Sequence, residues 1–557
     1  MPMKSITVAR NYPIFKRFSP INMKQLDEII KNVKKTYCCL DEIDFSKVDI
    51  DIFKPFFLKF INAVITECKF PKIEKCGIVR PLLKDIKLDK ENWKNYRPIC
   101  VNSYTHKLSQ AALHDQLFEY VTVNDILPKY QSAYKPLHSC QSALTRVYSD
   151  IVTHIDQGRC VVLVLLDLSA AFDTIDHGLL VSDLFNMGVR GGALELIRDF
   201  LSGRDTRVTI NGALSEPKGM LYGVPQGSVL GPLCFSLYIT SLANVLEELG
   251  VKYHIFADDT QLYIDFDGNA DINIIKNKLM NAFSKIDFWM NGRRLKLNID
   301  KIHLIIFGPK SIHDKVIAEF DYLEYNGSKL YPSTQVRNLG VIFDSKLTFK
   351  PMVNDVIKRC NYGLHKVRHT KAFIPNNMLI SVLHGEVFSK LDYCNILYLQ
   401  LPKNELSRLQ TIINKAVRIY FNLPPRHPTS EFLRRVHWLP MGPRIDYATL
   451  TMTHKAVVYG EPSYIKELLQ YEENRQDTSR VGPKIKIPER GRYKFSERSF
   501  AISAPRLYMQ LPPEMRRLTP EKFGPALKTF LFTEAYDHPL DSILKYNPSS
   551  GPYTYFV

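Results

Sequence analysis

The pattern of hydrophobic and polar positions first predicts a helix followed by a buried strand. Apolar residues recur at spacings of three and four over 143–155, which predicts an amphipathic helix with Ser139 as its N-cap. The run 161–166 is continuously apolar and rich in β-branched residues, as in strands that are covered on both faces. This predicted strand ends at Asp167.

A second pattern, further along the chain, predicts a hairpin. Two strand-like runs, 251–256 and 260–264, flank a short link that contains Asp258 and Asp259. A short polar link between such runs is typical of a hairpin, here with two carboxylates at its tip. Between the strand and the hairpin, residues 223–228 form a predicted turn that leads into an apolar stretch.

The first part of the chain gives broader predictions. The first 60 residues show modest apolar periodicity and no chemical motif, which predicts a helical extension. Pro98 disfavours helix at Arg97, so residues 95–99 are expected to be extended and to present a cation.

Beyond residue 350 the pattern becomes helical. Residues 404–420 predict a helix that Asn404 caps and that the prolines at 424–425 stop. Three cations lie off the apolar stripe of this helix: Arg408, Lys415 and Arg418. A solvated charged face is the commoner explanation of such cations, and contact with a nucleic-acid backbone is the alternative.

Composition and charge indicate a large folded protein with a basic last third. The 557 residues are 45% hydrophobic and 24% charged, as in globular proteins, and the length indicates several subdomains. The formal net charge is +17, and residues 351–557 hold 30 Lys and Arg against 18 Asp and Glu. The segment 480–495 interleaves cations with Tyr493 and Phe495. These features favour nucleic acid as a partner, although basic surfaces and loops without that role are common.

The cysteines and the apolar runs predict the cellular location of the protein. Ten cysteines are scattered without the spacing of a zinc site, and no charged-then-apolar leader follows Met1. The protein is therefore expected to be intracellular, in the nucleus, the cytoplasm or both, and not secreted. The longest tight apolar run is far shorter than the ~20 residues that cross a bilayer, so no membrane partner is expected.

Three carboxylates at the ends of apolar strands are the strongest chemical feature. Desolvation penalises a carboxylate in such a place unless a cation or another partner accompanies it. Two Mg²⁺ ions ~3.5–4 Å apart can hold the entering and leaving oxygens of a phosphoryl transfer, and Mg²⁺ prefers oxygen ligands. Asp167, Asp258 and Asp259 supply such ligands if the hairpin packs beside the strand. Taken alone, an Asp pair in a turn is more often only a turn former.

Three blocks of the sequence resemble the palm motifs of non-LTR (LINE-type) retrotransposon reverse transcriptases. In the order of that family, they are LLDLSAAFDTIDH at 165–177, YGVPQGSVLGP at 222–232 and FADD at 256–259. Further blocks resemble the fingers, later palm and primer-grip motifs: 81–84, 95–99, 131–134, 138–139, 289–301 and 338–341. Residues 438–440 and 503–507 resemble the C-terminal region of Jockey-type elements, so the similarity runs from about residue 25 to about residue 535.

This resemblance implies an α+β fold of the right-hand polymerase type. Residues 1–55 would be an N-terminal helical extension, and 56–345 the fingers and a palm whose antiparallel sheet carries the catalytic aspartates. Residues 346–430 would form a helical thumb, and 431–557 a basic, helical C-terminal region.

The resemblance also implies the catalytic centre. Asp167, Asp258 and Asp259 would be catalytic and would bind two Mg²⁺ ions, or Mn²⁺, together with the backbone carbonyl of Leu168. Further residues are implied to act on pyrophosphate or on nucleic acid: Lys301 as a proton donor, and Leu339 and Gly340 in the primer-grip block.

The incoming deoxynucleotide would meet a further set of residues. Lys84 and Arg97 resemble the fingers cations that hold the triphosphate, and Arg suits bidentate phosphate binding. Phe172 matches the steric gate that excludes a ribose 2′-hydroxyl, although outside the motif it would be taken for a core aromatic. Gln226 and Gly227 would line the templating base pair, where the missing side chain of Gly227 permits close approach.

Several positions depart from the usual family pattern, and none of them removes a metal ligand. Phe256 stands where Tyr is common, and Ile302 stands where Thr is expected. Lys135, Cys140 and Gln141 replace a frequent Arg, Thr and Glu. These changes are expected to affect the geometry of the fingers and the rate of synthesis more than the reaction itself.

The expected reaction is RNA-templated transfer of deoxynucleotides onto a primer 3′-OH. The expected partners are an RNA template, a DNA primer and dNTPs, with no small-molecule cofactor. Elements of this kind usually carry an endonuclease ahead of the polymerase, and no nuclease constellation precedes it here, which implies a fragment or truncated gene that could not nick its own target. The alternative is a catalytically inactive relic that still binds nucleic acid. An intron-type or telomerase-like polymerase is disfavoured by the Jockey-like C-terminal blocks.

Overall fold

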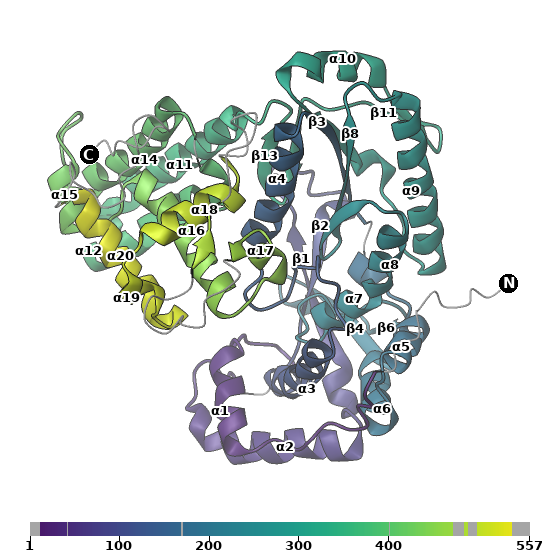
Figure 1. Ribbon diagram of the computed structural model, residues 1–557. Coiled ribbons are helices and arrows are strands. Elements are labelled where there is room, and N and C mark those ends of the chain that lie inside the picture. Colours follow the sequence, from purple (N-terminus) through teal and green to yellow (C-terminus); the bar gives the residue numbers. More distant parts are fainter. Residues whose placement is uncertain are drawn as a thin grey trace. The chain divides into compact units, whose positions relative to one another are not determined.

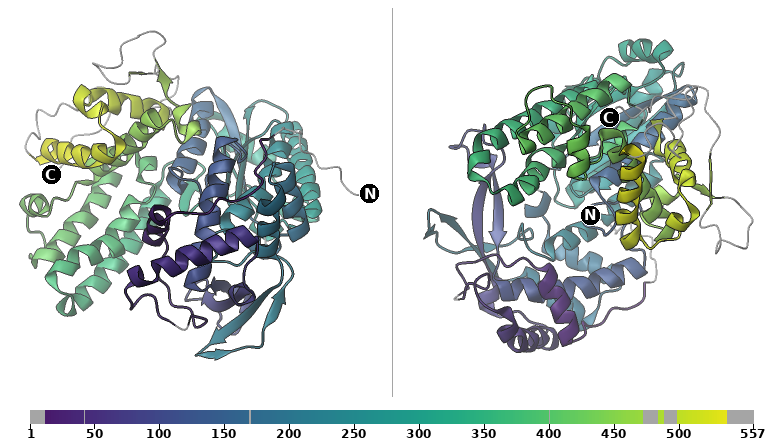
Figure 2. Two further views of the ribbon diagram at one scale, coloured as in Figure 1. Left: turned by 90° about the horizontal axis from the view of Figure 1, so that it is seen from below. Right: turned by 90° about the vertical axis from the view of Figure 1, so that its left-hand side faces the viewer.

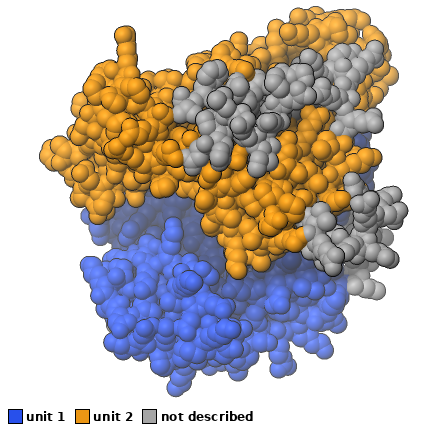
Figure 3. Space-filling view, turned by 60° about the vertical axis from the view of Figure 1, so that its left-hand side comes forward, with its two compact units in different colours: residues 1–134, 167–251, 281–300 blue, residues 135–166, 252–280, 301–557 orange. Residues whose placement is uncertain are grey.

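The computed structural model divides the chain into two compact units, each built from separate stretches of sequence. Figure 1 labels the helices and strands, and the structure describes residues 12–41, 43–168, 171–399, 401–471, 484–487 and 498–536. Unit 1 comprises residues 1–134, 167–251 and 281–300, and unit 2 comprises 135–166, 252–280 and 301–557 (Figure 3). Apart from 484–487, the predicted basic and aromatic segment 480–495 lies outside the described residues, as do Ser169 and Ala170 of the first palm block.

Unit 1 contains a five-stranded sheet. Its strands are β1 (Cys76–Leu83), β2 (Tyr96–Val101), β4 (Arg204–Ile210), β5 (Ala213–Leu214) and β6 (Lys218–Met220). The order is β2-β1-β4-β5, and β6 also pairs with β4. β1 and β2 are antiparallel, whereas β1 and β4 are parallel. The extended segment predicted around Arg97 is strand β2, so this prediction is confirmed.

The helices of unit 1 include those at the start of the chain. The α-helices are α1 (Met23–Asn32), α2 (Lys54–Glu67), α3 (Tyr104–Val123), α5 (His177–Asn186), α6 (Gly191–Leu201), α7 (Gly231–Tyr238), α8 (Thr240–Glu248) and the second part of α9 (Ile272–Gly292). The 3₁₀ turns used below are η2 (Lys72–Lys75) and η4 (Ala171–Asp173). α1 and α2 contact α3, so the first two helices pack onto the body of unit 1.

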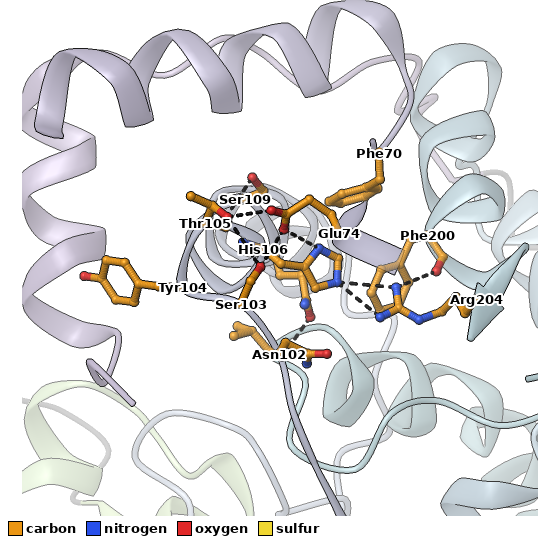
Figure 4. A network of polar contacts seen from close by, with 12 residues as sticks. Phe70, Glu74, Asn102, Ser103, Tyr104, Thr105, His106, Ser109, Phe200 and Arg204 are labelled. Atoms are coloured by element: carbon orange, nitrogen blue, oxygen red, sulfur yellow. Dashed lines mark hydrogen bonds and ion pairs between the residues drawn. The ribbon is translucent and has the colours of Figure 1, made fainter. Parts of the chain in front are cut away.

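A buried polar network ties η2, α3 and β4 together within unit 1 (Figure 4). Glu74 accepts hydrogen bonds from Ser103 at 2.8 Å and Thr105 at 2.6 Å, and its Oε2 lies 3.5 Å from His106 Nδ1. The guanidinium of Arg204 donates to His106 Nε2 at 3.3 Å. Burial and the charge of Arg204 hold the pKa of His106 well below its ordinary value, so the ring is neutral. A neutral ring that accepts at Nε2 carries its hydrogen on Nδ1, where it faces Glu74.

Unit 2 contains a four-stranded antiparallel sheet in the order β7-β8-β3-β9. Its strands are β3 (Arg159–Leu166), β7 (Lys252–Phe256), β8 (Asp259–Asp267) and β9 (His303–Phe307). Helix α4 (Cys140–Asp156) packs against β3, as Figure 1 shows. Ser139 caps α4 through a capping box, and the apolar positions of the predicted stripe are buried. The predictions of a capped helix and a following buried strand are confirmed.

Beyond β9, unit 2 is largely helical. Its short strands are β10 (Leu323–Tyr325), β11 (Ser328–Leu330), β12 (Gln335–Asn338), β13 (Val341–Asp344), β14 (Gln470–Tyr471) and β15 (Ile485–Lys486). Its helical elements are α10 (Lys310–Phe320), α11 (Lys350–Thr370), η6 (Lys371–Phe373), α12 (Asn376–Leu383), the π-helix η7 (His384–Phe388), α13 (Ser389–Asp392), η8 (Asn395–Tyr398), α14 (Lys403–Phe421), α15 (Ser430–Arg435), α16 (Met441–Val458), α17 (Ser463–Lys466), α18 (Phe500–Gln510), α19 (Pro513–Arg516) and α20 (Pro520–Tyr536). α16 contacts α14, α18 and α20, and Figure 2 shows these green and yellow helices from two sides. Among the described residues, no helix combines the length and the apolar character needed to cross a bilayer.

Helix α14 corrects one prediction and confirms another. It begins at Lys403, with Pro402 at the N-cap position, so Asn404 is inside the helix and is not its cap. The fixed φ of proline suits the residue before a helix, and the first turn forms here without a side-chain cap. At the other end, Asn422 adopts the left-handed conformation just before the prolines at 424–425, which is where the sequence predicted the stop.

Candidate active site

Two of the three predicted aspartates lie at the tip of the β7–β8 hairpin in unit 2. Phe256 pairs with Asp259, which leaves a two-residue turn of Ala257 and Asp258. Ala257 has a φ of +55° although it is not glycine, and this conformation costs roughly 1–2 kcal/mol. Asp259 is exposed and Asp258 is partly exposed. The predicted hairpin with two carboxylates at its tip is therefore confirmed.

The neighbouring strand β3 leads directly into the third aspartate. In the register of β3 and β8, Leu166 pairs with Thr260. The next residue after Leu166 in the chain is Asp167, and the residue before Thr260 is Asp259. An aspartate therefore stands next to the Leu166–Thr260 pair in each strand segment: Asp167 after Leu166, and Asp259 before Thr260.

Asp167 itself belongs to unit 1, and its backbone is fixed there. Its carbonyl accepts a hydrogen bond from Asn298 N at 3.1 Å, and Leu168 forms an isolated bridge with Leu297. Among the described residues, no group of three or more His, Cys, Asp or Glu side chains forms a preassembled metal cluster. The shared metal site of the three aspartates and Leu168 thus stays a prediction.

Unit 1 brings several of the predicted nucleotide-binding residues together. Gln226 Nε2 donates to both carboxylate oxygens of Asp173, at 2.8 and 3.0 Å, and Asp173 is the neighbour of Phe172 in η4. The carbonyl of Gln226 accepts from Cys100 N of β2 at 2.6 Å. Gly227 has a φ of +105°, and a Cβ added to it would lie 2.5 Å from the carbonyl oxygen of Cys100. Only glycine fits this close approach of two backbones.

The ring of Phe172 is held by packing on one side. It stacks on Phe235 with ring centroids 4.5 Å apart and meets Tyr134 edge-on at 6.3 Å. Its backbone carbonyl accepts from Val224 N at 2.9 Å, which fixes η4 to the 223–228 turn. Phe172 is only partly buried, so part of this fixed side chain stays accessible.

The two predicted fingers cations lie at the same end of the β1–β2 hairpin. Lys84 directly follows β1, and its backbone N donates to Asn95 O at 2.8 Å. Arg97 is the second residue of β2, and both cations are exposed. Desolvation raises the pKa of Asp173, whereas the hydrogen bond from Gln226 and the charge of Lys84 lower it. The field of Lys84 therefore reaches the Asp173–Gln226 pair.

The predicted primer-grip block is the β12–β13 hairpin of unit 2. Leu339 and Gly340 form its two-residue turn, and both have positive φ, the conformation of a type I′ turn. Asn338 Nδ2 donates to Gln261 Oε1 at 2.8 Å, and both side chains are buried. Because Gln261 lies in β8, two residues after Asp259, this bond fixes one hairpin to the other.

The remaining predicted cations do not converge on one place. Lys301 is exposed and lies two residues before β9. The cations of α14 each have a protein partner: Arg408 pairs with Glu405 at 2.7 Å, Lys415 donates to Asn361 at 3.2 Å, and Arg418 donates to His427 O at 3.0 Å. Their contact with nucleic acid stays a prediction.

Sequence analysis did not single out Asp173. It is part of the first palm block, but its role depends on Gln226, which lies 53 residues away. The signal in the sequence was a second acidic residue beside the steric-gate aromatic Phe172. Asn338 was likewise quoted only as part of a block, and its contact with Gln261 links residues 77 positions apart.

The antiparallel sheet with its acidic hairpin, the glycine-dependent turn and the helical remainder define a polymerase domain of the right-hand class. Residues 88–343 match the family described as reverse transcriptase (RNA-dependent DNA polymerase). This matched part, a little under half of the chain, is thus similar to the reverse transcriptase domains of non-LTR transposons.

Two similar proteins come from fruit flies. A probable RNA-directed DNA polymerase from transposon BS of Drosophila melanogaster is 27% identical over 360 residues, which cover 63% of this chain and 38% of that protein. The RNA-directed DNA polymerase from mobile element jockey of Drosophila funebris is 25% identical over 342 residues, covering 59% of this chain and 36% of that protein. A solved telomerase structure from Candida albicans, in complex with a telomeric RNA fragment, covers 72% of this chain and 67% of its own at 12% identity, but its TM-score of 0.34 is too low to bear on the fold. The chain spans little more than a third of the length of the two fly proteins.

Proposed function

We propose that the protein is an RNA-directed DNA polymerase that joins deoxynucleotides to a primer 3′-OH on an RNA template. The observation that carries this proposal is the β7–β8 hairpin, with Asp258 and Asp259 at its tip, paired to a strand that runs into Asp167. All three aspartates lie within the reverse transcriptase domain.

Reverse transcriptases act with divalent metal ions, and the donor set here suits two Mg²⁺ ions, with Mn²⁺ as a substitute. Asp167, Asp258 and Asp259 offer hard carboxylate oxygens, and Leu168 offers a backbone carbonyl. Asp258 and Asp259 keep solvent access, which a site that admits a triphosphate requires. When bound, the ions supply charge stabilisation for the entering and leaving oxygens.

The residues gathered in unit 1 are proposed to bind the incoming nucleotide. Lys84 and Arg97 would hold the triphosphate, because both are exposed cations at one end of the β1–β2 hairpin. The carboxylate of Asp173 orients the amide of Gln226, and Gly227, whose missing side chain lets the backbone of Cys100 approach, would hold this turn beside the templating base pair.

The remaining roles concern the primer and the product. We propose that Leu339 and Gly340 contact the primer, because their type I′ turn is fixed to β8 by Asn338. Lys301 would donate a proton to pyrophosphate. The proposed partners are an RNA template, a DNA primer and dNTPs, within the cell.

The direct test is primer extension on a homopolymer RNA template with the Asp258→Asn protein. The loss of one ligand of a metal site that contributes several kcal/mol lowers the incorporation rate on the order of 10³-fold. Asp271→Asn is the matched control, because Asp271 is an exposed residue of the same unit. Its side chain accepts a hydrogen bond from the backbone N of Asn273, and the Asn side chain that replaces it can accept the same bond. Folded protein that incorporates nothing with either metal would refute the proposal, and RNA binding without synthesis would select the inactive relic.

Sugar selection tests the role of Phe172. In Phe172→Val the ring that would meet a 2′-hydroxyl is gone, so the preference for dCTP over CTP is expected to fall roughly 100-fold. Phe235→Leu removes the stacking partner of Phe172 but keeps the Phe172 ring itself, so a much smaller change in the preference for dCTP over CTP is expected. Equal selection by wild type and Phe172→Val would show that Phe172 is only a packing residue.

A further inference from the structure

Unit 2 contains a pocket of about 440 Å³ that the proposed polymerase chemistry does not use. Elements far apart in sequence line it, among them the start of α4, η7, η8, α16 and α20. Two aromatic rings, Trp438 and Tyr447, and three cations, Arg444, Lys455 and Lys528, belong to its wall. The volume suits a single small ligand and not a helix or a strand.

The electrostatic balance of this pocket is positive. Among the described residues, Asp392 is the only acidic residue in the wall, and Arg444 neutralises it through two hydrogen bonds of 2.8 and 2.6 Å. Lys455 and Lys528 form no ion pair within the part of the chain that the structure describes. Burial, Arg444 and Lys528 lower the pKa of His384, which also lines the pocket. Two cations therefore remain to meet an anionic ligand.

The pocket wall also holds buried polar atoms that lack a partner. Asn395 is 1% exposed, and its Oδ1 accepts no hydrogen bond from the described residues. Thr451 Oγ1 is likewise buried without a partner. Buried polar atoms in native proteins are normally paired, so such atoms in a pocket wall indicate a donor that comes with a ligand or water. His384 begins the π-helix η7, and π-helical turns are frequent at functional sites.

We propose that this pocket binds one unpaired nucleotide of the RNA template. Its phosphate meets Lys455 and Lys528, its base lies against Tyr447, and Asn395 Oδ1 accepts a hydrogen bond from the edge of the base. Proteins that bind single-stranded RNA combine cations for the backbone with aromatic rings for unstacked bases. The rigid floor is Trp438, which is 3% exposed and packs against Phe388 at 4.5 Å. This inference rests on the proposed function, because that function supplies the RNA.

Binding of a fluorescent single-stranded RNA to the full chain, followed by anisotropy, tests the proposal. Lys455→Ala/Lys528→Ala is expected to weaken binding about tenfold and to reduce the salt slope of log K by about 0.7, the value for one phosphate contact on a single strand. The matched control is Lys466→Ala/Lys522→Ala, which removes two exposed lysines of α17 and α20 that are outside the pocket. A less than twofold change is expected for it. Equal weakening by the two variants would overturn the proposal in favour of nonspecific attraction.

Photocrosslinking identifies the residue that meets the base. RNA that carries 4-thiouridine is expected to crosslink to the peptide that contains Tyr447, and excess AMP is expected to compete only weakly. Tight saturation by AMP would instead show a site for free nucleotides, and the absence of any crosslink to the pocket wall would show that RNA lies elsewhere. Either result overturns the proposal.

The same proteins separate this proposal from the proposed function. If the wild type makes no DNA and the pocket variant binds RNA more weakly than the wild type, the polymerase proposal is refuted and the pocket proposal stands. If the wild type makes DNA and the pocket variant binds RNA as tightly as the wild type, the pocket proposal is refuted and the polymerase proposal stands. At saturating template the pocket variant should extend primers at the wild-type rate, because none of its changes touches the aspartates.

Discussion

The network around His106 in unit 1 and the pocket around Asn395 in unit 2 are both rich in buried polar groups, but their polar atoms are paired differently. In the network, Glu74 accepts from Ser103 and Thr105, and His106 lies between Glu74 and Arg204: its Nε2 accepts from Arg204, and its Nδ1 forms no hydrogen bond but lies 3.5 Å from Glu74 Oε2. In the pocket, Asn395 and Thr451 carry buried oxygens without partners next to about 440 Å³ of space. The number of buried polar groups thus says little about function. Whether the fold itself satisfies them distinguishes a structural network from a binding site.

The largest expected effect comes from breaking the network. Arg204→Met leaves the buried Nε2 of His106 without its donor and removes a positive charge that acts on Glu74, so the free energy of unfolding is expected to fall by about 3 kcal/mol. Urea denaturation measures this change. Arg198→Met, at an exposed position on α6, should change the same quantity by less than about 0.5 kcal/mol. A similar small change for both variants would show that the network is not structural.

Acid should weaken the network more than the pocket. The pKa of His106 is lower in the folded protein than in the unfolded chain, so the unfolded chain binds more protons below about pH 6.5, and the stability from the neutral ring is lost as the pH falls below that value. The expected slope is about 1.4 kcal/mol per pH unit. Burial raises the pKa of Glu74, which acts in the opposite sense as the pH falls.

The difference between wild type and His106→Gln isolates the contribution of the ring. Urea melts between pH 7.5 and 5.5 should show a shallower loss of stability in His106→Gln than in wild type. His384→Gln should also make the loss shallower but by less, because the pKa of His384 is lowered by a smaller amount than that of His106. A slope in His106→Gln equal to that of wild type would contradict the assignment of a buried neutral ring.

The smallest expected effect has the opposite sign and lies in the pocket. Thr451→Val removes a buried hydroxyl that has no partner, so the free energy of unfolding should rise by about 1 kcal/mol. Thr449 lies on the same helix, but its hydroxyl donates to Ile445 O at 2.8 Å, so Thr449→Val should lower stability by a similar amount. Differential scanning calorimetry compares the two. Destabilisation by both would show that Thr451 has a partner in solution.

Local patterns in the sequence predicted the parts of the fold that depend on neighbouring residues. Three elements were predicted in this way: the helix that Ser139 caps, the buried strand β3 and the acidic hairpin. The residues that predict each one lie within about 20 positions of one another. The predicted start of α14 was wrong, because Pro402 and not Asn404 stands at the N-cap position. A proline can precede a helix without a side-chain hydrogen bond, since its ring fixes φ.

The network and the pocket had no such signal. Glu74, His106 and Arg204 come from three segments, and the wall of the pocket comes from residues between 137 and 528. No periodicity links side chains over these distances. The same limit explains the Asp173–Gln226 pair, whose members are unremarkable until the fold joins them.

The interleaved chain path has a consequence for synthesis in the cell. β3 pairs with β8 and β9, so the partners of Leu163, Tyr263 and Ile305, are synthesised about 100 and 140 residues after it. At roughly 5–20 residues per second, β3 leaves the ribosome on the order of ten seconds before its last partner does. During that interval an apolar strand is without its sheet, which makes it a natural client for chaperones and the first place where aggregation would begin.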